Sequence, residues 1–151
     1  MEMYIEWLMC YVIREKMGGV RCTIREVLTM RDDIKVWLAQ AKIDLKAARN
    51  SLSTKDYGWA SVQAHQAAEK ALKFRLLLRG EELLKIHDLV KLAKIINAPN
   101  EVLEDCAVLT PVYFEMRYPE GSELPSQKIT KREVEQFIEV ALRIIKWSEK
   151  S

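Results

Sequence analysis

One stretch of the sequence, Gly58 to Gly80, most constrains what this chain can fold into. Between its two glycines the stretch contains no proline and no further glycine. Its small and apolar residues recur at alternating steps of four and three, which is the period of a helix. These residues are Ala60, Ala64, Ala67, Ala71, Phe74 and Leu78. Because the first four are alanines, a neighbouring helix can approach closely, and the stretch predicts the central helix of a small bundle.

A second long helix is predicted before this one. Asp32 or Asp33 can cap its amino end, and apolar residues continue at helical spacing to about Leu52. This seam consists of Ile34, Leu38, Ala41, Leu45, Ala48 and Leu52. A short polar turn at residues 51–56 follows, so we expect the two helices to lie antiparallel.

Two shorter helices are predicted after Gly80. Asp88 is a residue type that caps helices, and it precedes an apolar pattern of helical period. A further helix should begin at Pro99 or Asn100. Pro111 lies inside that pattern and should kink the helix or end its first half, because proline lacks the backbone N–H that a helix interior needs.

The last part of the sequence predicts a loop and one more helix. Residues 117–127 include two prolines and a glycine, which is typical of an exposed loop. Thr130 and Glu133 have the spacing of a capping box at the start of the final helix. The sequence therefore predicts an all-α fold, an up-and-down antiparallel helical bundle of about five helices.

The length of 151 residues suits one domain with a hydrophobic core. Residues 1–30 show no consistent apolar period, so we interpret them as an N-terminal extension of a domain that spans residues 31–151. Packing of this extension onto the domain is the alternative. If it is an extension, its deletion should change thermal stability little.

Composition and motifs exclude several functions. A net charge of +2 does not favour general polyanion binding. Common nucleotide-binding and zinc-binding motifs are absent, so we predict neither a cofactor nor a metal. The apolar segment from Met3 to Ile13 is short and contains Glu6, which argues against a membrane span and a signal peptide and favours a cytoplasmic protein. Three widely spaced cysteines are interpreted as reduced and structural: Cys10, Cys22 and Cys106.

Polar residues on or beside apolar helices are the candidates for a functional site. His65 and Glu69 lie one helical turn apart and can form a pair, although a histidine on an apolar helix often serves only packing. His87 should lie at the amino end of a helix, where the free N–H groups would stabilise an anion. Capping and packing are the alternative role. The full set is His65, Glu69, His87, Asp88, Arg117 and Tyr118.

Three sequence blocks carry a family resemblance. They are AHQAAEKALKFRLL, KIHDLVKLAKII and YFEMRYPEG, in this order. Together they resemble the HEPN domain of prokaryotes, in the branch often encoded beside a minimal nucleotidyltransferase, and the resemblance covers roughly residues 31–149. It implies an up-and-down bundle, usually dimeric, that is associated with nucleotide or RNA handling. A nucleotidyltransferase partner, as in a toxin–antitoxin pair, is also implied.

One departure from the family bears on activity. HEPN ribonucleases carry an arginine and a histidine separated by four to six residues, and this sequence has no such pair. Arg79 and His87 are too far apart, and no histidine follows Arg117. We therefore predict a subunit that binds a nucleotide or RNA phosphate through His87, Asp88 and Arg117, with Tyr118 stacking on a base and His65 and Glu69 as secondary candidates.

Two other functions stay open at this stage. His87 and Arg117 could supply the base and the cation of a metal-independent endoribonuclease toxin. The domain could also be a purely structural dimerisation module. A homodimer is predicted in each case, because large apolar residues such as Trp37, Phe74 and Trp147 exceed what one thin bundle should cover.

Overall fold

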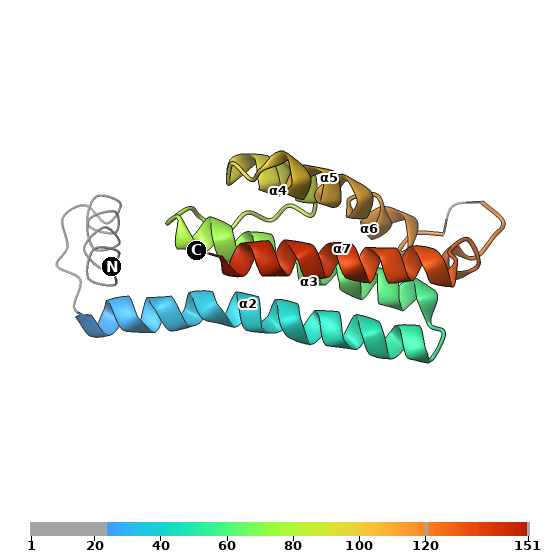
Figure 1. Cartoon of the computed structure of the whole chain (residues 1–151), viewed down its shortest axis with the longest axis horizontal. Coiled ribbons are helices and arrows are strands. Elements are labelled where there is room, and N and C mark those ends of the chain that lie inside the picture. The colour runs from blue at the N-terminus through green and yellow to red at the C-terminus, as the bar shows by residue number, and fades with distance from the viewer. Residues whose placement is uncertain (1–23, 120, 151) are drawn as a thin grey trace.

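The computed structural model describes residues 24–119 and 121–150, which form a helical bundle (Figure 1). Among these residues there is no strand, and the predicted all-α fold is confirmed. The helices are α2 (Ile24–Ser53), α3 (Tyr57–Leu78), α4 (Leu89–Ile95), α5 (Asn100–Leu109), α6 (Val112–Glu115) and α7 (Lys131–Glu149), with a short 3-10 helix η1 (Pro125–Gln127) before α7.

Helix α2 begins earlier than predicted. It starts at Ile24, so Asp32 and Asp33 lie inside the helix and do not cap it. An aspartate is tolerated there because Asp32 pairs with Lys35 one turn later, at 3.5 Å. Of the predicted extension, residues 24–30 are therefore helical and residues 1–23 lie outside the described part. The domain boundary and the effect of deleting the extension stay predictions.

Helices α2 and α3 pack antiparallel through alanines, as predicted. Fully buried alanines of this interface and the adjoining core are Ala41, Ala48, Ala60, Ala64, Ala67 and Ala71. Two polar links join the helices at different heights. The Ser51 hydroxyl donates to the Gln63 side-chain oxygen at 2.8 Å, and Lys70 donates to Asp44 at 2.5 Å. Helix α3 also contacts α4, α5, α6 and α7, so its predicted central place is confirmed.

The end of α3 depends on Gly80, whose φ of 71° favours glycine. The Gly80 N–H donates to the Leu77 carbonyl and the Glu81 N–H to the Leu76 carbonyl, which is the Schellman arrangement. The chain then returns along the bundle without regular structure to Asp88 (Figure 1). The Asp88 carboxylate accepts from the Lys91 N–H at 2.9 Å and caps α4, as predicted.

Pro111 divides the fourth predicted helix into two. Helix α5 ends at Leu109, and α6 begins just after the proline. Within α5, Cys106 is a buried free thiol, and burial raises its pKa to about 12. It is therefore protonated at neutral pH, in agreement with a structural role. Cys10 and Cys22 lie outside the described residues.

Helix α7 starts with the predicted capping box. The Glu133 N–H donates to the Thr130 hydroxyl at 3.3 Å, and the Thr130 N–H donates to the Glu133 carboxylate at 2.8 Å. The helix runs in the same direction as α3 and opposite to α2 (Figure 1). It buries the seam Val134, Ile138, Ala141 and Ile145. Within residues 24–119 and 121–150, no helix is long and apolar enough to span a membrane.

Candidate functional site

The side chain of His87 lies at the centre of a polar cluster beside α3. Its Nδ1 is 3.0 Å from a carboxylate oxygen of Glu69. Its ring stacks on Tyr113 of α6, with ring centroids 4.4 Å apart and an interplanar angle of 10°. The backbone carbonyl of His87 lies 3.1 Å from Nε2 of His65. His65 therefore holds the backbone of His87, and Glu69, one turn later on α3, holds its ring.

The hydrogen bond to the His87 carbonyl assigns the tautomer of His65. A carbonyl only accepts, so His65 carries its proton on Nε2 and donates to the His87 carbonyl. Burial lowers the pKa of His65 to about 4, although the nearby Glu69 acts to raise it, so the ring is neutral at pH 7. Its Nδ1 is buried without a hydrogen-bond partner, 3.8 Å from Glu69. His65 and Glu69 therefore lie close together without a direct hydrogen bond, and both residues contact His87.

Glu69 also binds a buried lysine. Lys73 donates to the second carboxylate oxygen at 2.6 Å, and both side chains are almost fully buried. Burial acts to raise the pKa of Glu69. The hydrogen bonds from Lys73 and His87 outweigh burial, so the pKa lies below its ordinary value. Glu69 is therefore an anion at neutral pH. Lys73 was not predicted as a site residue, because an apolar pattern gives no sign that a lysine within it is buried.

Arg117 lies next to the same aromatic ring as His87. Its guanidinium carbon is 4.7 Å from the centroid of the Tyr113 ring, a cation–π distance. The segment that begins α4 and the segment that follows α6 are thus brought together at Tyr113. Tyr113 was not among the predicted site residues. The side chain is mostly buried and connects the two predicted site residues.

Asp88 and Tyr118 take part in other contacts. The Asp88 carboxylate occupies the amino end of α4 through its bond to Lys91, so an anion placed there would meet a negative charge. Tyr118 is 53% exposed and stacks on the exposed Phe114 at 6.2 Å. It lines a cavity of about 430 Å³ between α6, the η1 region and α7.

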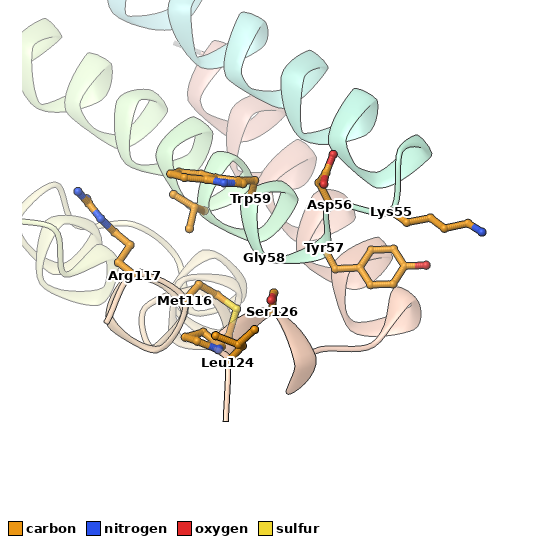
Figure 2. Close-up of a pocket in the computed structure, with 11 residues that line it drawn as sticks. Lys55, Asp56, Tyr57, Gly58, Trp59, Met116, Arg117, Leu124 and Ser126 are labelled. Carbon is orange, nitrogen blue, oxygen red and sulfur yellow. The ribbon is translucent and has the colours of Figure 1, made fainter. Parts of the chain in front are cut away.

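A larger cleft of about 700 Å³ lies at the bundle end formed by the turn between α2 and α3 (Figure 2). Arg117 borders it on one side, and Trp59 from the first turn of α3 lies beside it. Met116, Leu124 and Ser126 lie below Trp59 in Figure 2, whereas the Lys55 side chain points away from Arg117. Trp59 is 66% exposed. The cleft thus combines an exposed aromatic ring with a guanidinium.

Trp59 was not predicted as a site residue, although the sequence contains a signal for it. Trp59 lies off the alanine seam that buries one side of α3, and a tryptophan outside a buried seam is a candidate for ligand contact. The cleft itself had no sequence signal, because it is formed by α3, the end of α6 and the loop before α7.

Comparisons with known proteins agree with the bundle. The sequence model of the HEPN domain matches residues 34–151. The structure is similar to TT1696 from Thermus thermophilus, with 32% identity, a TM-score of 0.73 and coverage of 78% of this chain and 96% of that chain. It is also similar to ST0689, an archaeal HEPN homologue, with 32% identity, a TM-score of 0.67 and coverage of 77% and 94%.

A third solved structure is an HEPN domain protein from Thermotoga maritima. It shares 26% identity and a TM-score of 0.61, with coverage of 75% of this chain and 93% of that chain. No curated protein matches the sequence.

Proposed function

Because this chain belongs to the HEPN domain family, we propose that it is a subunit that binds the phosphate of a nucleotide or RNA. It acts with a minimal nucleotidyltransferase partner, as in a toxin–antitoxin pair, in the cytoplasm. The observation that carries the binding proposal is the cleft at the end of the bundle, where Arg117 and the exposed Trp59 lie together. The partner rests on the family resemblance, and a nucleotidyltransferase gene adjacent to this one would support it.

The two residues suit two parts of a nucleotide. A guanidinium binds phosphate oxygens through charge-assisted hydrogen bonds, and an exposed indole ring stacks on a base. Arg117 is already oriented by the Tyr113 ring, so less side-chain freedom is lost when a phosphate binds. Asp88 is engaged in capping α4, and the phosphate contact is therefore assigned to Arg117.

Arg117→Ala should weaken binding of a fluorescently labelled single-stranded RNA by about 1.5 to 3 kcal/mol, roughly tenfold to a hundredfold in Kd. Trp59→Ala should cost about 1 to 3 kcal/mol through lost stacking. Fluorescence anisotropy measures both, at one fixed salt concentration because phosphate contacts depend on salt.

Arg79→Ala is the matched control for this experiment. Arg79 is an exposed arginine at the opposite end of α3, and its substitution removes the same charge without touching the cleft. If Arg117→Ala binds RNA as the wild type does but melts earlier, Arg117 serves only to pack on Tyr113, and the binding proposal is wrong.

A homodimer is part of the proposal. Phe74 is buried within one chain, so it no longer argues for a partner surface. Val36 and Ile43, by contrast, are 61% and 58% exposed and lie two turns apart on the outer face of α2. Exposed apolar residues on one helix face are typical of an interface.

Light scattering at micromolar concentration should give the mass of a dimer, and Ile43→Glu should shift the protein towards the monomer. A monomer mass for the wild type would contradict the dimer. A dimer that persists in the variant would place the interface away from this face of α2.

A metal-independent endoribonuclease is the second candidate. It is favoured by the contact between His87 and Glu69, which resembles the orientation of a general base by a carboxylate, with Arg117 near the same ring. RNA fragments that form in the presence of a chelator and disappear in His87→Ala would support the enzyme over the binding subunit.

A further inference from the structure

The hydrogen bond to Glu69 determines what His87 offers to a ligand. A carboxylate only accepts hydrogen bonds, so the proton of a neutral His87 lies on Nδ1. The other nitrogen, Nε2, then carries a lone pair and can only accept. Within the described residues Nε2 makes no hydrogen bond, and the side chain is 43% exposed. In its neutral form His87 is therefore an oriented acceptor at Nε2, on a side chain that is partly exposed.

The cluster beneath His87 keeps this arrangement fixed. Lys73 is a donor only and holds one oxygen of Glu69 at 2.6 Å, which leaves the second oxygen for His87. His65 holds the backbone of His87, and Tyr113 holds its ring. A buried ion pair is weak as a source of stability, because desolvation offsets the attraction of the two charges. We therefore assign the Glu69–Lys73 pair a second role, which is to hold the imidazole of His87 in one tautomer.

An acceptor does not suit a phosphate. Phosphate oxygens are themselves acceptors, so a neutral His87 has no proton on Nε2 with which to bind them. Arg117, with its five N–H donors, is the group for the phosphate. The partner of Nε2 must be a donor, and on a nucleotide backbone the donor is a sugar hydroxyl. His87 and Arg117 both contact the Tyr113 ring, so the acceptor and the guanidinium lie beside the same side chain.

We propose that His87 Nε2 accepts a hydrogen bond from the 2′-hydroxyl of a ribonucleotide bound at Arg117, and that Glu69 is the positioning residue that makes His87 an acceptor. This inference rests on the proposed function and adds a selection of ribose over deoxyribose. The 2′-hydroxyl is the group by which a protein distinguishes RNA from DNA at a given position.

The test compares oligoadenylates that differ only in the sugar. Labelled oligoriboadenylate and oligodeoxyadenylate are titrated with the full chain, and the ribonucleotide is checked on a gel to be uncleaved. The wild type should bind the ribose form about threefold to tenfold more tightly, the effect of one neutral hydrogen bond. His87→Ala should bring the ratio to about one.

Glu69→Gln tests whether Glu69 sets the tautomer of His87 or only stabilises the fold. Lys73 will hold the amide oxygen of the new side chain, because a lysine cannot pair with an amide NH₂. That NH₂ then faces His87 Nδ1 and donates to it, which moves the imidazole proton to Nε2. The variant should lose the preference for ribose and still bind both oligomers through Arg117. Adding Lys73→Met frees the amide oxygen to accept from Nδ1 and should restore part of the preference.

Nitrogen-15 NMR of the imidazole gives an independent measurement on the wild type. At pH 8 the shifts of His87 should report a protonated Nδ1 and an unprotonated Nε2, and Glu69→Gln should reverse them. This measurement and the ratio in His87→Ala decide the inference even if Glu69→Gln does not fold.

The possible failures are distinct. If neither oligomer binds the wild type, the proposed function is wrong and the inference falls with it. If both bind equally well, or if a folded Glu69→Gln keeps the ribose preference, phosphate binding stands and the role of His87 and Glu69 is overturned.

Discussion

Glu69→Leu is expected to lower the free energy of unfolding by about 3 to 5 kcal/mol, because it leaves Lys73 as a buried charge without its partner. The Lys73 side chain is only 7% exposed and cannot reach water without rearrangement. The same substitution removes the acceptor of His87. Urea unfolding followed by circular dichroism measures the change. A second substitution, Lys73→Leu, should restore most of the loss, since the leucine pair needs no ionic partner.

The chain offers a matched control for this prediction. Lys131 and Glu135 form an ion pair on α7 at the same spacing of four residues, 3.3 Å apart, but both side chains are at least half exposed. Because water solvates an exposed charge that loses its partner, Glu135→Leu should change stability little. A loss in Glu69→Leu no larger than in Glu135→Leu would contradict the burial of the Glu69 and Lys73 charges.

Acidification should destabilise the protein through His65. Burial lowers its pKa from 6.5 to about 4 in the folded chain, so between these values the unfolded chain binds a proton that the folded chain does not. The free energy of unfolding therefore falls as the pH falls through this window, by about 2 kcal/mol at pH 5. Glu69, whose folded pKa is lowered below 4.5, loses its own contribution only at still lower pH.

His65→Gln isolates this effect. Glutamine can still donate to the His87 carbonyl but does not titrate. Urea unfolding at pH 7, 6 and 5 should show a smaller loss of stability for the variant than for the wild type, whatever its stability at pH 7. Parallel pH profiles for the two proteins would contradict the burial of a neutral His65.

Much of the fold could be predicted because local signals specify it. The alanine period gives the packing of α3, Gly80 ends that helix, and the spacing of Thr130 and Glu133 marks the start of α7. The predicted start of α2 was wrong for a physical reason. An aspartate that suits a helix cap is also tolerated inside a helix when a lysine follows one turn later, and the residue type does not distinguish these cases.

The site could be predicted only in part. His87 and Arg117 were identifiable as polar residues beside apolar helices, and the structure brings them to one ring. Their connection through Tyr113 depends on how α6 lies on α3 after the break at Pro111, which no spacing in the sequence encodes. Trp59 and Arg117 line one cleft together with the loop before α7, and no sequence spacing encodes this arrangement.

The alanine interface between α2 and α3 has a consequence for alignment of the two helices. Alanine side chains are short and alike, so a surface of alanines offers few obstacles to sliding one helix along the other by a turn. The links from Ser51 to Gln63 and from Asp44 to Lys70 remove this freedom. The members of each pair are equidistant in sequence from Tyr57, as the strands of a symmetric hairpin are. We infer that these two hydrogen bonds fix the register of α2 against α3. The alanines only allow the two helices to approach closely.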